Sequence, residues 1–356
     1  MKKLLFICLS VFLLGSCSND EPNNNFEEFV PVPYTLKIPP FFEQNILAPV
    51  IPINNPLTWE GVALGKKLFF DPILSVDNSI SCADCHAPST SFTDKDQFSD
   101  GVNGLLGDRN SMPLFNLAWN YDERFFWDGS AFSLEEQVFH PVTDVEEMAN
   151  TWSNVVSELG ANSDYPDLFL AAFGDSKIDS IKVAKAIAQF ERTLISSDSK
   201  FDNYLAGAIE LSPSEENGLA VFMDETRGDC FHCHGNPNNP LWTDNIFHNN
   251  GLDSTFTDLG LGAVTGDPAD NGKFKSPSLR NLAFTAPYMH DGRFATLGEV
   301  IDHYSEGLKP SATIDPLMKK VAQGGVRITE KDKADLKAFL LSLSDDKFIN
   351  NINFKE

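Results

Sequence analysis

Two short stretches of the sequence decide the fold: SCADCHAPSTSFTD at residues 81–94 and GDCFHCHGN at residues 228–236. Each contains the pattern Cys-x-x-Cys-His, and together they use four of the six cysteines of the chain. The residues concerned are Cys82, Cys85, His86, Cys230, Cys233 and His234. Because cysteine and histidine are both scarce here, chance is a poor explanation for finding the pattern twice.

The pattern predicts covalent attachment of a c-type haem at each stretch. The two thiols bond the porphyrin vinyl groups, and the histidine that follows reaches the iron as its proximal ligand. Two other uses of paired cysteines stay open at this point: one zinc site built from all four thiols, or a pair of redox-active dithiols. The histidine after each pair and the export signal described next both favour haem.

The first seventeen residues, MKKLLFICLSVFLLGSC, have the pattern of a bacterial secretory signal, with two lysines before an apolar stretch. The ending Leu-Gly-Ser-Cys resembles a lipobox, which predicts acylation of Cys17 and a lipoprotein anchored to a membrane by its acyl chains. Simple cleavage without a lipid is the alternative. Either outcome places the protein in the periplasm or cell envelope, where c-type haem is attached.

The net charge and the polar run after the signal limit the partners. The formal charge is −24, which predicts a surface that repels nucleic acid and anionic lipid and attracts a basic partner such as a small redox protein. Residues 18–28 are too polar to enter a core, so we interpret them as a tether within an N-terminal extension at 18–50. No later segment is apolar enough to cross a bilayer, which leaves the lipid anchor as the predicted membrane contact.

The remaining residues, roughly 300, exceed what one hydrophobic core usually organises, so we predict two haem domains at 51–205 and 206–356. The periodicity is helical, as in the apolar stripe Val183, Ile187 and Phe190. A capping box at 212–215 begins a helix that runs towards the second motif, and residues 61–71 echo it before the first. Strand-like alternation is scarce. The predicted fold class is all-α: two cytochrome c-like haem domains with long loops and little β structure.

The residues after the first motif indicate an iron with an open face. A haem that only conducts electrons normally has His or Met as its sixth ligand. The loop at 87–110 contains neither residue type. Apart from His86, His234 and the motif residue His232, the free histidines are His140, His248, His290 and His303. An open face would let a small substrate reach the first iron.

Several further segments follow in a specific order: RNSMPLFN (109–116), FFWDGSAFSLEEQ (125–137), PVTDVEEM (141–148) and KSPSLRNLAFTAPYMHDGRFATLGEVIDHY (275–304). With both haem motifs in register, residues 50–345 resemble the bacterial di-haem cytochrome c peroxidases and their relative, the methylamine-utilisation enzyme that matures a tryptophylquinone. The resemblance implies two haems that face each other across an interdomain seam. The N-terminal haem would bind hydrogen peroxide, and the C-terminal haem would receive electrons from a donor such as a cytochrome c.

The resemblance also implies catalytic residues. The distal acid/base glutamate falls on Glu147, although Glu146 and the surrounding acidic run leave a merely solvated residue as the alternative. A glutamine that orients peroxide falls on Gln137, and the tryptophan between the haems falls on Trp127, which core packing would equally explain. A carboxyl group beside an open iron can move the proton whose transfer breaks the peroxide bond.

The resemblance further implies a calcium ion between the domains, bound by Asn110 and the backbone carbonyls of Thr285 and Pro287; a metal-free turn is the alternative. On the far side of the second haem, Tyr304 stands where many relatives have methionine. Thr296 to Tyr304 has the pattern of a capped helix with Tyr304 on its apolar stripe and His303 pointing elsewhere. The tryptophylquinone-maturing relative has tyrosine at this position, so the resemblance implies Tyr304 as the ligand to the second iron, with Met289 or no ligand as the alternative.

One departure from the family affects regulation. Many di-haem peroxidases have a histidine after the first motif that blocks the iron until the second haem is reduced, whereas residues 93–109 contain none. We therefore expect a first haem that is open from the start. Three functions stay open: a hydrogen peroxide reductase, an oxidase of a protein or organic substrate with the same architecture, and an electron carrier. Relatives suggest a homodimer.

Overall fold

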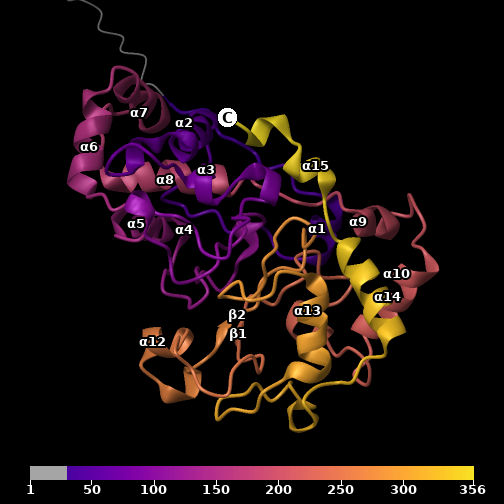
Figure 1. Ribbon diagram of the computed structural model, residues 1–356. Coiled ribbons are helices and arrows are strands. Elements are labelled where there is room, and N and C mark those ends of the chain that lie inside the picture. Colours follow the sequence, from indigo (N-terminus) through magenta and orange to yellow (C-terminus); the bar gives the residue numbers. More distant parts are fainter. Residues whose placement is uncertain (1–29) are drawn as a thin grey trace, which may run out of the picture.

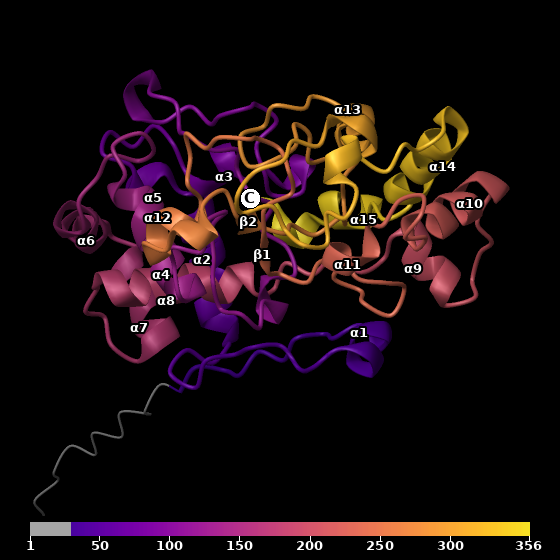
Figure 2. The same cartoon turned by 90° about the horizontal axis from the view of Figure 1, so that it is seen from below.

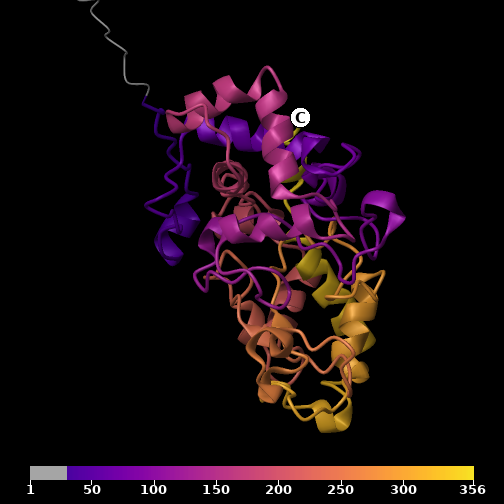
Figure 3. The same cartoon turned by 90° about the vertical axis from the view of Figure 1, so that its left-hand side faces the viewer.

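The computed structural model describes residues 30–356, so the predicted signal peptide, Cys17 and the tether at 18–28 lie outside the described residues. Figure 1 shows two helical bodies: the first is purple and magenta, and the second is salmon to yellow. Figure 3 shows them one above the other. Among residues 30–356 no helix is long and apolar enough to span a membrane. The predicted all-α class is confirmed, since a single two-stranded sheet is the only sheet in this part of the chain.

The first body is built around α2 and α8, which lie side by side. Gly65 of α2 faces α8 so closely that a Cβ atom there would lie 1.8 Å from the backbone oxygen of Ala186. The predicted stripe of α8 is buried in a core that runs from Leu64 to Leu194. The helices of this body are α2 (Trp59–Phe70), α3 (Cys82–Cys85), α4 (Leu134–Gln137), α5 (Phe139–Thr143), α6 (Trp152–Ala161), α7 (Tyr165–Phe173) and α8 (Ser180–Glu191).

The second body is built around α10 and α14 in the same way. A Cβ atom at Gly218 of α10 would lie 2.0 Å from the backbone oxygen of Asp335 in α14. The predicted capping box of Ser212 and Glu215 is present at the start of α10. The helices of this body are α9 (Lys200–Leu205), α10 (Pro213–Phe222), α11 (Phe231–His234), α12 (Leu261–Thr265), α13 (Leu297–Asp302) and α14 (Glu330–Leu341).

The first helices of the two pairs share a short sequence pattern, which supports the duplication suggested by the sequence. Gly65-x-x-Leu68-Phe69 in α2 matches Gly218-x-x-Val221-Phe222 in α10. In each body this helix leads to the short helix that bears the haem motif, α3 or α11. A glycine is required at both crossings because any side chain would push the paired helices apart.

The two ends of the described chain pack against residues far away in the sequence. The C-terminal helix α15 (Asp346–Ile349) returns to the first body, where Phe348 packs against Phe92 with ring centroids 5.7 Å apart. The range 206–356 therefore includes a tail that belongs to the first core. At the other end, the segment that carries α1 (Pro40–Asn45) lies along the lower edge of the view in Figure 2. Its Phe42 is buried against Trp119, so this part of the extension packs on the protein body.

Strands β1 (Phe247–His248) and β2 (Phe274–Lys275) are antiparallel, with Phe247 opposite Lys275. They lie where the two bodies meet in Figure 1. The backbone N–H of Lys275 donates to the carbonyl of Trp127 across this boundary, at 2.8 Å. The small sheet thus connects a segment of the second body to the part of the first body that carries the predicted bridging tryptophan.

Candidate functional site

The first Cys-x-x-Cys-His motif opens into a cavity of about 910 Å³, which Cys82, Cys85 and His86 line. Nδ1 of His86 donates to the carbonyl of Phe92 at 2.9 Å, which fixes the tautomer and leaves Nε2 without a proton. Burial lowers the pKa of His86, so its ring is a neutral imidazole. A neutral, oriented imidazole beside two thiols is the donor set that a c-type haem requires.

The second motif lines a separate, smaller cavity of about 210 Å³ with Cys230, Cys233 and His234. Burial lowers the pKa of His234 to about 4, so this imidazole is also neutral. Since the two cysteine pairs line different cavities, they do not form the four-thiol zinc site that the sequence left open. Both motifs fit a covalently bound haem with a histidine ligand.

One other cluster of potential metal ligands lies in the described part of the chain: Glu225, Asp229 and His232. The ammonium of Lys319 already lies among them, 3.1 Å from a Glu225 oxygen and 3.6 Å from an Asp229 oxygen. It also lies 3.2 Å from Nε2 of His232. The cluster is therefore an ion network that carries its own cation.

Glu147 and Gln137 line the same cavity as His86, and their catalytic roles stay predictions. Burial, followed by the charges of Asp144 and Glu146, raises the pKa of Glu147 to about 7. Its backbone is fixed, because the Val102 N–H donates to the Glu147 carbonyl at 2.8 Å. Glu146 lines the same cavity, so position alone does not distinguish the two acids. The raised pKa of Glu147 favours Glu147 as the proton-transfer group.

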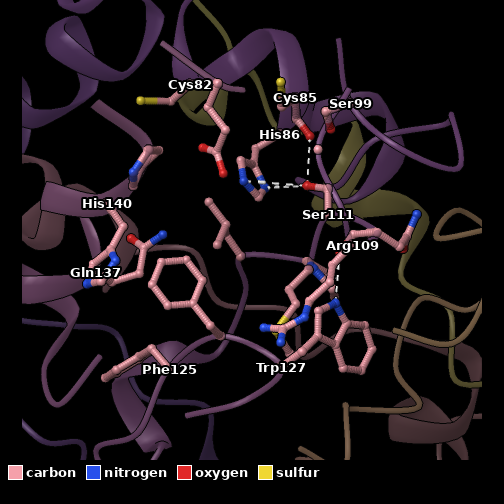
Figure 4. A pocket seen from close by; sticks show the side chains of 18 of the residues that line it. Cys82, Cys85, His86, Ser99, Arg109, Ser111, Phe125, Trp127, Gln137 and His140 are labelled. Carbon is pink, nitrogen blue, oxygen red and sulfur yellow. Dashed lines mark hydrogen bonds between the residues drawn. The ribbon is translucent and has the colours of Figure 1, made fainter. Parts of the chain in front are cut away.

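The sequence analysis left His140 without a role, yet it also lines the first cavity. Figure 4 shows His140, Gln137 and Phe125 on one side of the open space and His86 on the other. The His140 ring packs edge-on against Phe126, with centroids 5.2 Å apart. Within residues 30–356 this ring has no hydrogen-bond partner, so its nitrogens are free for a ligand in the cavity. The sequence offered one indication of this placement, because His140 directly precedes Pro141, the first residue of the PVTDVEEM segment.

Glu191 is a second residue that the sequence analysis missed. It ends α8, is 3% exposed and lines the first cavity. One of its carboxylate oxygens is buried without any hydrogen-bond partner among the described residues. Burial raises the pKa of Glu191 to about 8, so the group is a neutral acid at pH 7.

Trp127 lies at the boundary and lines both cavities, and its role as the bridging tryptophan stays a prediction. Its indole N–H donates to the carbonyl of Asn110 at 2.7 Å, and the Asn110 N–H donates to the carbonyl of His290 at 2.8 Å. Figure 4 shows the indole beside Arg109. The ring is thus held in one orientation between the two haem motifs.

The three residues implied as calcium ligands share one cavity wall. Asn110, Thr285 and Pro287 all line the second cavity. The amide nitrogen of Asn110 donates to the carbonyls of Asp96 and Gln97, each at 3.2 Å, which leaves its side-chain oxygen as the atom for a cation. Hard cations prefer this combination of amide and carbonyl oxygens.

Tyr304 also lines the second cavity, as does the alternative ligand Met289. Tyr304 lies in a π-helical turn at His303–Gly307 that follows α13. Its hydroxyl accepts from the side chain of Asn250 at 3.2 Å, and burial raises the pKa of Tyr304 to about 12. A phenolate would therefore need a strong positive partner such as ferric iron. His303 points elsewhere, with Nε2 3.3 Å from the carbonyl of Asn250.

Comparisons with known proteins agree with this geometry. Residues 59–210 match the protein family described as di-haem cytochrome c peroxidase. The methylamine utilization protein MauG of Methylorubrum extorquens is 39% identical over 298 residues, covering 82% of this chain and 80% of that protein. The cytochrome c551 peroxidase of Pseudomonas aeruginosa is 34% identical over 301 residues, covering 82% and 80%.

A solved structure shows the same architecture along almost its whole length. It is described as a MauG-like protein associated with microbial copper homeostasis, is 34% identical and gives a TM-score of 0.81. The match covers 90% of this chain and 99% of that chain. This solved structure therefore shares the overall fold of the chain.

Proposed function

Since the chain belongs to the di-haem cytochrome c peroxidase family and the family implies two c-type haems, we propose that it reduces hydrogen peroxide to water. One peroxide, two electrons and two protons give two waters, and the electrons come from a small redox protein such as a cytochrome c. The observation that carries this proposal is the first cavity, where Glu147 and Gln137 share one space with the haem motif of Cys82, Cys85 and His86.

The side chains of the first cavity handle the protons. The bound haem would supply the iron that takes peroxide and the electrons. Glu147 accepts the proton of the inner peroxide oxygen and returns it to the outer oxygen, first as base and then as acid. Its pKa of about 7 suits both steps near neutral pH. Gln137 donates a hydrogen bond that orients the peroxide.

The second cavity would receive the electrons. Tyr304 and Met289 line this cavity together with His234, so one of them would hold the iron of the second haem along with that histidine. Trp127 lines both cavities and shortens the path between them. A calcium ion at Asn110, Thr285 and Pro287 would hold the two bodies in this arrangement.

The remaining expectations concern the location and assembly of the protein. A signal peptide, acylation at Cys17, a periplasmic or cell-envelope location and a homodimer stay predictions. A ferric first haem that reacts without prior reduction stays a prediction as well, and the absence of histidine from 93–109 supports it.

One observation favours a second function. Tyr304 lines the second cavity, where a phenolate ligand would favour ferric and higher oxidation states. The enzyme would then use peroxide to oxidise a protein or organic substrate, as the resemblance to the tryptophylquinone-maturing relative implies. The family relatives named peroxidases favour the first function.

The test is steady-state turnover of the two-haem protein with hydrogen peroxide and reduced cytochrome c. Rapid oxidation of the cytochrome at two equivalents per peroxide supports the peroxidase function. Slow turnover with fast reaction of the ferric protein towards peroxide supports the substrate oxidase. If peroxide leaves the absorbance spectrum of the ferric protein unchanged, the protein does not react with peroxide and is an electron carrier only.

A further inference from the structure

Lys275 is a buried cation at the boundary between the two cavities. It ends β2, is 6% exposed, and lines both the first and the second cavity. Its backbone N–H donates to the carbonyl of Trp127 at 2.8 Å, which ties its position to that of the bridging ring. None of the roles proposed above uses this residue.

The ammonium of Lys275 has only neutral partners. Nζ donates to the carbonyl of Asn245 at 2.7 Å and to the side-chain oxygen of Asn120 at 3.3 Å. It also lies 5.2 Å from the centre of the Phe247 ring. No carboxylate within residues 30–356 forms an ion pair with it. Buried charges in proteins are normally paired, because an unpaired charge loses its hydration without compensation.

The more distant charges do not change this conclusion. Asp122 and Asp244 favour the charged form of Lys275, and Arg124 opposes it. Burial is nevertheless the largest effect and lowers the pKa of Lys275 to about 8. The site therefore lacks an anion close to the ammonium.

The surroundings show which cavity would supply that anion. Asn120 and Asn245, the two partners of the ammonium, line the first cavity together with Lys275, and neither lines the second. An ammonium has three N–H groups, of which two are used here. The third is left for an acceptor on the side of the first cavity.

We propose that Lys275 pairs with a propionate carboxylate of the first haem and raises the reduction potential of that haem. A c-type haem keeps two propionates, so haem binding would bring two carboxylates into the first cavity, which Lys275 lines. A fixed positive charge beside the porphyrin stabilises the reduced form, which carries one more electron. The inference rests on the two haems implied by the family, and it makes no use of peroxide turnover.

The test compares Lys275→Met with Lys275→Arg in the two-haem protein. Both haems are titrated spectroelectrochemically without peroxide, so the result is independent of the proposed activity. We expect Lys275→Met to lower the reduction equilibrium constant of the first haem at least tenfold, which is about 59 mV for one electron, and the second haem by less. Lys275→Arg should keep the wild-type values.

Lys273→Met is the matched control. Lys273 lies two residues away, lines neither cavity and forms an ion pair with Asp270 at 2.9 Å. Lys273→Met removes one positive charge, as Lys275→Met does, and we expect the reduction potentials of both haems to stay at their wild-type values. A first haem in Lys275→Met that moves no further than in this control would overturn the proposal.

Lys275→Gln is a second neutral variant, used in case Lys275→Met fails to fold. Its side-chain amide can still donate to the carbonyl of Asn245. If both neutral variants lose the first haem while Lys275→Arg retains it, the charge is what that haem requires, and the proposal holds. If the arginine variant loses the first haem as well, the proposal is overturned.

Discussion

The two haem cavities stand on duplicated helix pairs, yet their linings differ in chemistry. Phe190 in α8 corresponds to Phe339 in α14, and the next residue is Glu191 in the first body and Leu340 in the second. Each lines its own cavity. The first body thus has a carboxyl group where its counterpart has an apolar side chain.

The predicted site residues of the two cavities differ as well, and again the first cavity has the acidic group. The first cavity has Glu147 and Gln137 in about 910 Å³, whereas the second has Tyr304 and Met289 in about 210 Å³. The common scaffold positions His86 and His234, and under the proposed function the substituted lining would decide which haem iron a substrate can reach. This comparison yields tests that act on one cavity and leave the other as an internal reference.

The largest effect is expected from Glu147→Gln. The amide has nearly the same shape but cannot take a proton from peroxide, so turnover should fall by about 100-fold or more. Glu146→Gln is the matched control, because Glu146 is the adjacent acid of the same cavity, and it should keep most of the activity. The measurement is kcat/KM for peroxide with both haems confirmed by absorbance. Equal losses in the two variants would remove the special role of Glu147.

The second cavity is tested by Tyr304→Phe. Removing the phenolate ligand should raise the potential of the second haem by a fraction of the about 0.8 V that axial ligands span, and should leave the first haem unchanged. Tyr288→Phe is the control, since Tyr288 lines the same cavity and donates to the carbonyl of Leu282 at 2.6 Å. A near-infrared methionine-to-iron band in the wild type would show instead that Met289 is the ligand.

Glu191→Leu installs in the first cavity the residue type that the second carries. The native pKa of about 8 lies above the unfolded value of about 4.5, so the native state holds the extra proton and stability falls as pH rises between these values. The variant lacks this dependence. Its melting temperature relative to wild type should therefore increase from pH 5 to pH 8. If the melting temperatures of wild type and variant change in parallel from pH 5 to pH 8, Glu191 has an ordinary pKa.

Local rules explain what the sequence could predict. Haem attachment depends on a fixed spacing of thiols and histidine, so both motifs were found directly. The helix starts at Ser212 and Thr296 depend on capping boxes within four residues, and both are present. The packing of Phe348 on the first core could not be predicted, because an apolar segment does not encode which of two cores it joins.

The residues that the sequence analysis missed become significant only through tertiary packing. Lys275 opens a motif that was quoted for its resemblance, yet its lack of a carboxylate partner depends on residues from three segments. Glu191 lies four residues after Ile187, beside the apolar stripe of α8, but a carboxylate oxygen without a hydrogen-bond partner is visible only in the folded structure. His140 belongs to the first cavity because the α4–α5 turn carries it there together with Gln137.

The smallest effect is expected from His140→Gln. The His140 ring has free nitrogens in the first cavity, so it can assist proton movement, but Glu147 already provides the nearby group with a pKa of about 7. Turnover should fall only a few-fold, well short of the loss in Glu147→Gln. Paramagnetic resonance of the ferric protein should show one high-spin and one low-spin haem in both wild type and variant. Two low-spin haems in the wild type, with one becoming high-spin in His140→Gln, would instead make His140 an iron ligand. The first cavity would then be as closed as the second, and the contrast between the two bodies would lie in their ligands alone.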